Sequence, residues 1–316
     1  MAKSGQPVPE ALPAGADTGH LQERIDVVRR RRTGNTVAAV VLVVATALFV
    51  YGAATNPTYS WPDFARYLFD WRVIEAARNT LLLTVSSMLG AVVLGVLLAV
   101  MRLSPNRVLQ SSSWVYLWIF RGTPVYVQLV FWGLFSTIYK EIHLGIPFGP
   151  TFATFSTENL LSVFQLAVLG LALNEAAYMA EIVRAGISSV DHGQAESATA
   201  LGLTWWQTMS RIVLPQAMRV IIPPTGNEVI SMLKTTSLVT AVPYSLELYT
   251  RTRDIASETF NPIPMLLVAS AWYLMFTSVL MAGQFYLERS FADGSTRTRP
   301  SRRARALSRA AQKEHA

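Results

Sequence analysis

Charged and polar side chains at helical spacing interrupt an apolar segment in the middle of the chain. Asn174, Tyr178 and Glu181 lie at positions i, i+4 and i+7 of the run 160–183, so a helix presents them on one face. Glu181 and Arg184 lie three residues apart, which lets them pair on the helix surface. An ionisable group inside a membrane segment is costly and usually faces a cavity or a partner. We therefore expect Glu181 and Arg184 to form a structural or gating ion pair.

Two other apolar segments carry polar residues that need partners. Arg121 and Gln128 lie seven residues apart and share a helix face. Glu228 and Lys234 lie six residues apart and do not share one, so each needs its own partner on another helix. Contact with a polar solute and hydrogen bonding between helices are both consistent with this pattern.

Patterns that would indicate catalysis are missing from the sequence. It contains no G-x-x-x-x-G-K-[ST] loop, no H-E-x-x-H and no G-x-S-x-G. It has no cysteine, and its four histidines are scattered without metal-ligand spacing. We expect no catalytic residue, no metal site and no cofactor in this chain, and any ATP hydrolysis must belong to a separate polypeptide.

Composition indicates an integral membrane protein. Of the 316 residues, 51% are hydrophobic and 15% charged, and the mean hydropathy is +0.32. Soluble proteins carry roughly 25% charged residues. The net charge of +7 comes from basic residues at the two ends of the chain, without an interleaved aromatic surface, so it does not indicate nucleic-acid binding.

Apolar runs predict an all-α bundle of about six transmembrane helices, because about 20 apolar residues span a bilayer. Residues 1–35 and 291–316 are polar and basic and are expected to be disordered cytosolic arms. Residues 56–79 alternate aromatic and charged residues at helical spacing, which predicts an interfacial amphipathic helix. Residues 140–158 and 243–262 are expected to be outer loops. The predicted spans are an extra N-terminal helix at 36–55, then 80–101, 114–139, 160–183, 221–242 and 263–287.

Basic residues predict the orientation. With both termini in the cytosol, 20 of the 27 Lys and Arg residues fall in inner segments, and the inverted topology would reverse that ratio. We therefore expect a multi-pass plasma-membrane protein whose segment between the fourth and fifth spans is cytosolic.

That segment, 188–217, reads as two short helices joined by a tight turn. Asp191 with Gln194, and Thr204 with Gln207, are capping pairs that begin the helices. Gly202 fits the left-handed residue between them, and Pro215 is expected to end or bend the second helix. Because a lipid-embedded backbone could not carry this break, the segment must lie in water or against another protein.

The spacing of Glu196-x-Ala198, Gly202 and Leu214-Pro215 resembles the EAA loop of ABC-transporter permeases. In that family the loop is a cytoplasmic coupling helix that docks in a groove of the ATP-hydrolysing subunit. Ser197 stands where the family usually has Ala, a change between small residues that should keep the helix. The resemblance implies a coupling role for Gly193, Glu196, Ala198, Gly202, Trp205, Leu214 and Pro215.

Longer motifs resemble the polar-amino-acid branch of these permeases, over roughly residues 75–290. They include Arg121-Gly122-Thr123-Pro124, Ala177-Tyr178-x-x-Glu181 and Lys234-x-Thr236-Ser237-Leu238. The resemblance implies the type I (MetI-like) transmembrane domain of ABC importers. Such permeases often have five spans, so the first helix is an addition. The candidates for the substrate pathway are Gln128, Asn174, Glu175, Tyr178, Glu228 and Lys234, and those for the gating or structural ion pair are Arg121, Glu181 and Arg184.

The same resemblance implies the partners. They are two cytosolic ATPase subunits that hold ATP and Mg²⁺, an extracytoplasmic amino-acid-binding protein, and a second permease subunit, identical or related. A polar amino acid is the implied substrate. The alternatives are a secondary transporter or channel without an ATPase partner, and a membrane-embedded enzyme, which would need a clustered acid/base or metal set that we do not see.

Overall fold

The computed structural model describes residues 33–146, 149–157 and 160–292. The chain divides into two compact units, residues 1–55 and 56–316. In the first unit, helix α1 (Thr33–Thr55) covers the predicted first span and is apolar on all sides. The predicted basic arms lie mostly outside the described residues. At their inner edges the structure differs, because residues 33–35 and 291–292 are helical.

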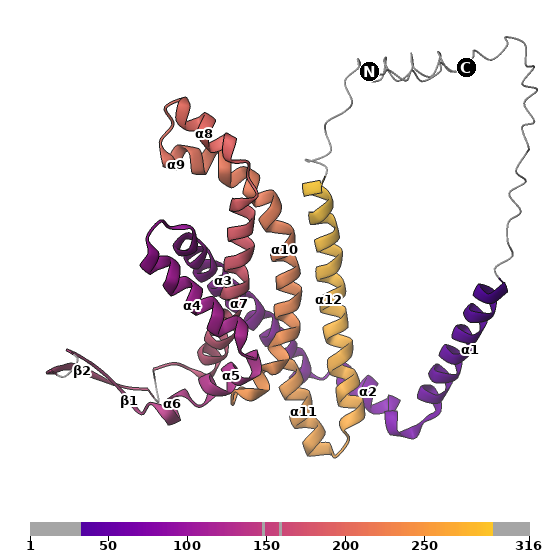
Figure 1. Cartoon of the computed structure of the whole chain (residues 1–316). Coiled ribbons are helices and arrows are strands. Elements are labelled where there is room, and N and C mark those ends of the chain that lie inside the picture. Colours follow the sequence, from indigo (N-terminus) through magenta and orange to yellow (C-terminus); the bar gives the residue numbers. More distant parts are fainter. Residues whose placement is uncertain (1–32, 147–148, 158–159, 293–316) are drawn as a thin grey trace, which may run out of the picture. The chain divides into compact units, whose positions relative to one another are not determined.

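The second unit is a helical bundle (Figure 1). Its long helices are α3 (Trp71–Leu103), α7 (Val163–Ser188), α10 (Leu214–Thr235) and α12 (Pro262–Ala292). Shorter helices complete it: α2 (Trp61–Leu68), α4 (Arg107–Gly122), α5 (Val125–Gly133), α6 (Phe135–Ile138), α8 (His192–Ala200), α9 (Trp205–Thr208) and α11 (Leu248–Thr259), with 3-10 turns η1 (Pro57–Tyr59) and η3 (Thr236–Ala241) and the π turn η2 (Met209–Val213).

Within the described residues, four helices are long and apolar enough to cross a membrane: Gly34–Thr55, Trp71–Leu103, Val163–Ser188 and Pro262–Phe291. The other two predicted spans are less regular. The segment 114–139 is divided into α4, α5 and α6, because the chain leaves the helix at Thr123 and Pro124. The segment 221–242 is divided between α10, which contains Pro223 and Pro224, and η3.

Three predictions about the outer segments were wrong. The loop expected at 243–262 contains helix α11 (Leu248–Thr259). The helix expected at 56–79 ends at Leu68, and Asp70 then caps the long helix α3 through the backbone N–H of Arg72 at 2.9 Å. The loop 140–158 contains an antiparallel hairpin of β1 (Glu141–Gly145) and β2 (Thr151–Ser156), the only strands in the described residues.

The core forms where α3 and α7 pack along each other. Leu83, Ala91, Leu171 and Met179 are buried in its main cluster. Gly95 permits the close approach, because a Cβ atom there would lie 2.6 Å from the Cβ of Met179. Small residues at helix contacts are how membrane helices gain packing, since lipid offers no hydrophobic driving force between them.

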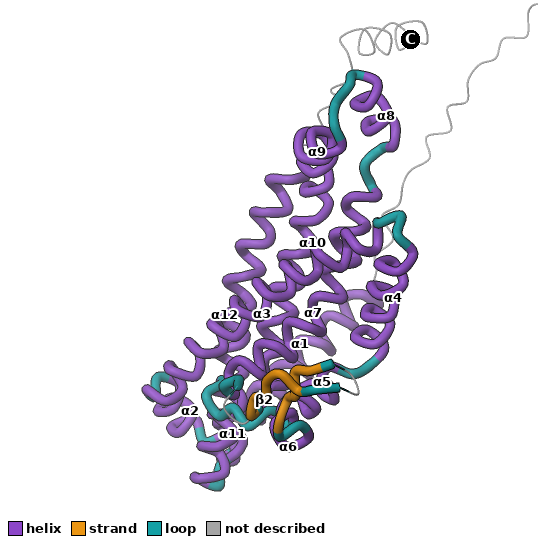
Figure 2. Tube along the Cα trace, turned by 90° about the vertical axis from the view of Figure 1, so that its left-hand side faces the viewer, coloured by secondary structure: helices purple, strands orange, loops and turns teal. Residues whose placement is uncertain are grey.

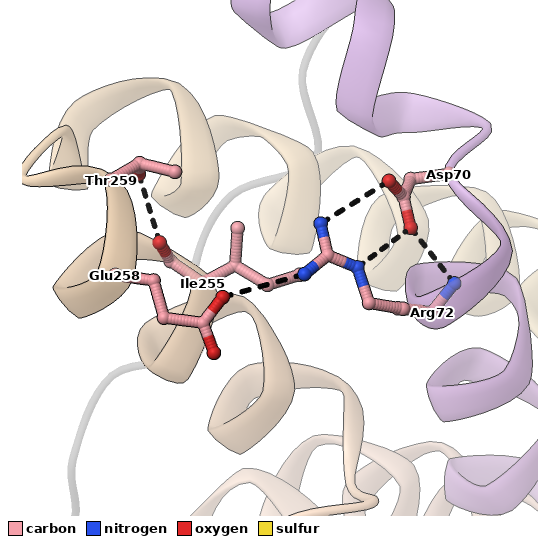
Figure 3. Close-up of polar contacts among 5 residues, drawn as sticks. All are labelled: Asp70, Arg72, Ile255, Glu258 and Thr259. Carbon is pink, nitrogen blue, oxygen red and sulfur yellow. Dashed lines mark hydrogen bonds and ion pairs between the residues drawn. The ribbon is translucent and has the colours of Figure 1, made fainter.

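Opposite ends of the bundle carry different elements. The α8–α9 hairpin and the turn between α3 and α4 lie at one end, whereas α2, α6, the β-hairpin and the α11–α12 turn lie at the other (Figures 1 and 2). At this second end, Arg72 joins the start of α3 to α11 (Figure 3). Its guanidinium lies 3.2 Å from the Asp70 carboxylate and 3.4 Å from that of Glu258.

Candidate functional site

A polar cavity of about 270 Å³ lies among α5, α7 and α10. Its polar lining comes from Asn174, Glu175 and Tyr178 on α7 and from Glu228, Ser231 and Thr235 on α10. Ser231 and Thr235 were missed at the sequence level. They follow Glu228 at i+3 and i+7, so the helical spacing of hydroxyl residues was the signal that could have found them.

Asn174 and Gln128 connect α7 to the break between α4 and α5. The Nδ2 of Asn174 donates to the Phe120 carbonyl at 3.0 Å and to the Oε1 of Gln128 at 3.1 Å. The Nε2 of Gln128 donates to the same Phe120 carbonyl at 3.0 Å and to the Oγ1 of Thr123 at 2.7 Å. Both amides therefore hydrogen-bond between helices and satisfy a carbonyl that the helix break at Pro124 leaves free.

Two carboxyl groups face this cavity. Glu175 is only 7% exposed, and its Oε1 atom has no hydrogen-bond partner. Glu228 lies close enough to interact with it electrostatically. Among the described residues, neither carboxyl group forms an ion pair with Lys or Arg. Two carboxyl groups without a Lys or Arg partner on one cavity can accept charge-assisted hydrogen bonds from a cationic ligand.

The remaining predicted residues lie around this cavity. Lys234 is exposed near the end of α10 and does not line the cavity. Glu181 and Arg184 pair at 2.7 Å, and the Arg121 guanidinium lies 5.4 Å from the centre of the Tyr178 ring. Tyr178 lines both the acidic cavity and a neighbouring cavity of about 420 Å³ that contains Arg121 and Glu181.

The α8–α9 hairpin has its own set of caps. The Asp191 carboxylate accepts a bond from the backbone N–H of Gly193 at 2.8 Å, so it caps α8 without the predicted reciprocal bond from Gln194. Thr204 and Gln207 form the predicted capping box at the start of α9. Gly202 has φ +77°, the left-handed conformation expected of it.

Pro215 differs from its prediction. It lies in the first turn of α10, and the π turn η2 joins α9 to that helix without a break. The helix runs on through Pro215, which has no N–H to donate, directly after a π turn in which the Leu214 N–H donates to the Met209 carbonyl. The hairpin is therefore continuous with α10 at one end and follows directly from α7 at the other.

Exposed apolar side chains mark the free end of the hairpin. Leu201, Trp205 and Trp206 are 82%, 63% and 74% exposed, whereas Ala198 is buried between the helices. Glu196 is also exposed. Contiguous exposed apolar surface on a segment that cannot be in lipid is typical of a protein interface.

The bundle has helices long enough to span a membrane and a polar cavity between them, and the α8–α9 hairpin presents apolar side chains to a partner. These features define a membrane transport protein that works with a partner protein. The family model described as "Binding-protein-dependent transport system inner membrane component" matches residues 91–293. The chain belongs to this family and is the membrane component of a binding-protein-dependent transport system.

Comparison with individual proteins gives similarity beyond the residues that the family model matches. The chain is 56% identical to the arginine transport system permease protein ArgU of Corynebacterium glutamicum, over 93% of this chain and 91% of the relative. It is 37% identical to the histidine/lysine/arginine/ornithine transport system permease protein HisM of Salmonella typhimurium, over 64% and 83%. A solved structure described as an amino acid ABC transporter with histidines is 31% identical, with a TM-score of 0.57, over 69% and 94% of the two chains.

Proposed function

We propose that this chain is the permease subunit of an ATP-driven importer for a cationic amino acid. The observation that carries the substrate class is the pair of unpaired carboxyl groups, Glu175 and Glu228, on the cavity among α5, α7 and α10. The names of the two relatives, which specify arginine and other basic amino acids, support the same class.

The proposed transporter contains further chains. An extracytoplasmic binding protein delivers the amino acid to the end of the bundle that carries α11 and the β-hairpin. A second permease subunit, identical or related, completes the membrane part. Two cytosolic ATPase subunits hold ATP and Mg²⁺, and this chain hydrolyses nothing. The concentration of Lys and Arg in the terminal segments supports cytosolic termini and, with them, a cytosolic hairpin between the fourth and fifth predicted spans.

The hairpin is the proposed coupling element. Glu196, Gly202 and Trp205 lie in the segment that we place against the ATPase, together with Gly193, Ala198, Leu214 and Pro215. Because α8 follows α7 and η2 leads directly into α10, movement of the hairpin tilts the two helices that carry Glu175 and Glu228. Closure of the ATPase subunits on ATP then favours the state in which the cavity is open to the outside. Hydrolysis restores the inward-open state, so the cycle is a two-state shift.

Uptake by reconstituted vesicles tests the substrate class. Vesicles that contain this permease, its ATPase and its binding protein should accumulate radiolabelled arginine only with internal ATP. The double variant Glu175→Gln/Glu228→Gln is supplied with arginine by the same binding protein. A change in its uptake rate is therefore caused by the altered cavity of the permease. Loss of a charge-assisted hydrogen bond costs about 1.5–3 kcal/mol, so arginine uptake should fall roughly 10- to 100-fold for each carboxylate removed.

Glu288→Gln is a matched control, because that carboxyl group is exposed near the end of α12 and does not line the cavity. It should transport normally. Equal uptake by the double variant and the unmodified protein would refute the cation site, and accumulation driven by an ion gradient without ATP would refute the importer.

A further inference from the structure

Two adjoining cavities follow one side of α4 near the α3–α4 turn. They measure about 290 and 420 Å³ and share Arg102 and Trp114. Gln110 and Ser111 line the first cavity, and Trp118 and Arg121 line the second. The turn lies at the same end of the bundle as the α8–α9 hairpin (Figures 1 and 2).

These cavities carry positive charge without a counter-charge. Among the described residues, Arg102 forms no hydrogen bond or ion pair, and the contact of Arg121 is with the Tyr178 ring. Glu181, the one carboxylate in the two linings, already accepts two hydrogen bonds from Arg184 at 2.7 and 2.9 Å. This surplus repels a cationic amino acid and attracts an anion.

Aromatic side chains form the apolar wall. Trp114 and Trp118 lie one helical turn apart, with ring centres 6.3 Å apart and planes 4° from parallel. They are 52% and 65% exposed, although the adjoining side of α4 packs on the bundle: Ser113 Oγ donates to the Leu98 carbonyl at 2.9 Å, and Leu117, which also lines the second cavity, is buried. Amphipathic indole rings are enriched at the level of lipid headgroups.

We propose that these cavities bind an anionic phospholipid. Its phosphate contacts Arg102 together with the polar side chains of Gln110 and Ser111, and its glycerol and upper acyl chains lie along Trp114 and Trp118. Basic pockets between membrane helices on the cytoplasmic side bind anionic lipid headgroups. The assignment to the cytoplasmic leaflet rests on the orientation proposed above, whereas the binding itself does not.

The lipid site borders the substrate cavity. Tyr178 lines the 420 Å³ cavity and also the acidic cavity that contains Glu175. Arg121 lies against the face of the Tyr178 ring. Occupancy by an anion on the Arg121 side therefore changes the electrostatic surroundings of the substrate cavity, and transport should depend on the anionic lipid content of the membrane.

Native mass spectrometry of the permease–ATPase complex tests the binding. The complex is titrated with phosphatidylglycerol and, separately, with phosphatidylcholine. Phosphatidylglycerol should bind more tightly, and Arg102→Gln should weaken it roughly 10-fold, since a charge-assisted hydrogen bond is lost. Arg107→Gln is the matched control: it removes the same charge from the same turn, but Arg107 is exposed and lines neither cavity. It should change the affinity less than two-fold.

Several results would overturn the proposal. Equal affinity for the two lipids, or equal weakening by Arg102→Gln and Arg107→Gln, would show nonspecific surface attraction. Displacement of the lipid by millimolar inorganic phosphate would show a site for small anions. Because the chain has no cysteine, Gln110→Cys provides a unique thiol; efficient disulfide formation with the equivalent position of the second permease would show a subunit interface. Any of these leaves the importer function intact, so the two proposals fail separately.

Discussion

At the scale of single residues, the bundle depends on polar groups whose partners come from distant parts of the chain. Glu247 is completely buried, and its carboxylate accepts bonds from Thr80 of α3 at 3.3 Å, from the backbone and hydroxyl of Thr250 of α11, and from the hydroxyl of Tyr273 of α12. No Lys or Arg in the described part of the chain pairs with it. One carboxylate therefore holds three helices together.

Replacing Glu247 with Ala should destabilise the permease strongly, because several buried donors lose their acceptor. A loss of roughly 3–5 kcal/mol is expected, against about 2 kcal/mol for Thr80→Val, which removes one donor to Glu247 and the acceptor of the buried Leu248 N–H. Thermal unfolding in detergent, followed by tryptophan fluorescence, measures both. Equal melting temperatures for Glu247→Ala and the unmodified protein would show that the carboxylate stabilises nothing.

The ion pair of Asp70 with Arg72 should make the stability of the fold depend on pH. Its hydrogen bond from the Arg72 side chain lowers the pKa of the Asp70 carboxyl below the ordinary value of 3.8. A lowered pKa stabilises the fold above the unfolded-state value, and the gain is lost as pH falls through the folded-state value. Asp70→Asn keeps a residue that can cap α3 but removes the charge. The variant should melt at a slightly lower temperature at pH 7. The difference should shrink as the pH falls below 3.8 and vanish once the pH is below the folded-state pKa of Asp70; a difference that does not shrink with falling pH would contradict the role of the charge.

Residue types and spacing identified the candidate positions. They were less informative about the residues that each candidate contacts. The Glu181–Arg184 pair is local, so helical spacing was enough to find it. The bonds of Asn174 and Gln128 to the Phe120 carbonyl join residues 54 and 8 positions apart, and they depend on how α4 breaks. No periodicity within one segment carries that information.

At the scale of elements, long apolar runs identified the helices, and the exceptions have physical causes. The helix expected at 56–79 stops at Leu68 because Asp70 begins a new helix there, a change of direction that spacing alone does not reveal. The β-hairpin in 140–158 depends on cross-strand pairing of residues such as Ile142 and Phe155. The Gly and Pro residues of this segment indicated a loop, and the short apolar–polar alternation of its strands was not recognised. Pro215 was expected to end or bend the second short helix, and the helix does not end there but runs on from η2 into α10.

The turn between α8 and α9 depends on Gly202. Nothing lies within 4 Å of a Cβ atom built there, so a substitution would cost backbone strain alone. Gly202→Ala should destabilise the turn by about 1–2 kcal/mol, whereas Gly202→Asn should cost less, since Asn tolerates the left-handed region. Amide hydrogen exchange across α8 and α9 should accelerate roughly 5- to 30-fold in the Ala variant. Unchanged exchange, with normal ATP-driven uptake, would show that the turn geometry is unimportant for coupling.

At the scale of the whole molecule, the chain combines a family bundle with an additional unit. The family match begins at residue 91, whereas residues 1–55 form a separate unit with its own apolar helix. The resemblance seen in the sequence predicts the core within residues 75–290, and the family model matches residues 91–293.

Removing residues 1–55 should therefore leave transport by the bundle intact. We expect ATP-driven arginine uptake per inserted molecule within about two-fold of the full chain, with the amount of inserted protein measured by immunoblot of the membrane fraction. A truncated protein that inserts normally, melts normally and does not transport would show that the first unit takes part in the transport cycle.

The central claim is that the α8–α9 hairpin transmits the motion of a cytosolic ATPase to the helices around the acidic cavity. Leu201 is 82% exposed at the end of that hairpin, and the chain has no cysteine, so Leu201→Cys places a single thiol at the proposed contact. We predict that this thiol reacts with a membrane-impermeant maleimide only from the cytosolic side. We also predict that it cross-links to the ATPase, and that the cross-link stops arginine uptake. Labelling from the outside, or free uptake by the cross-linked complex, would contradict the account.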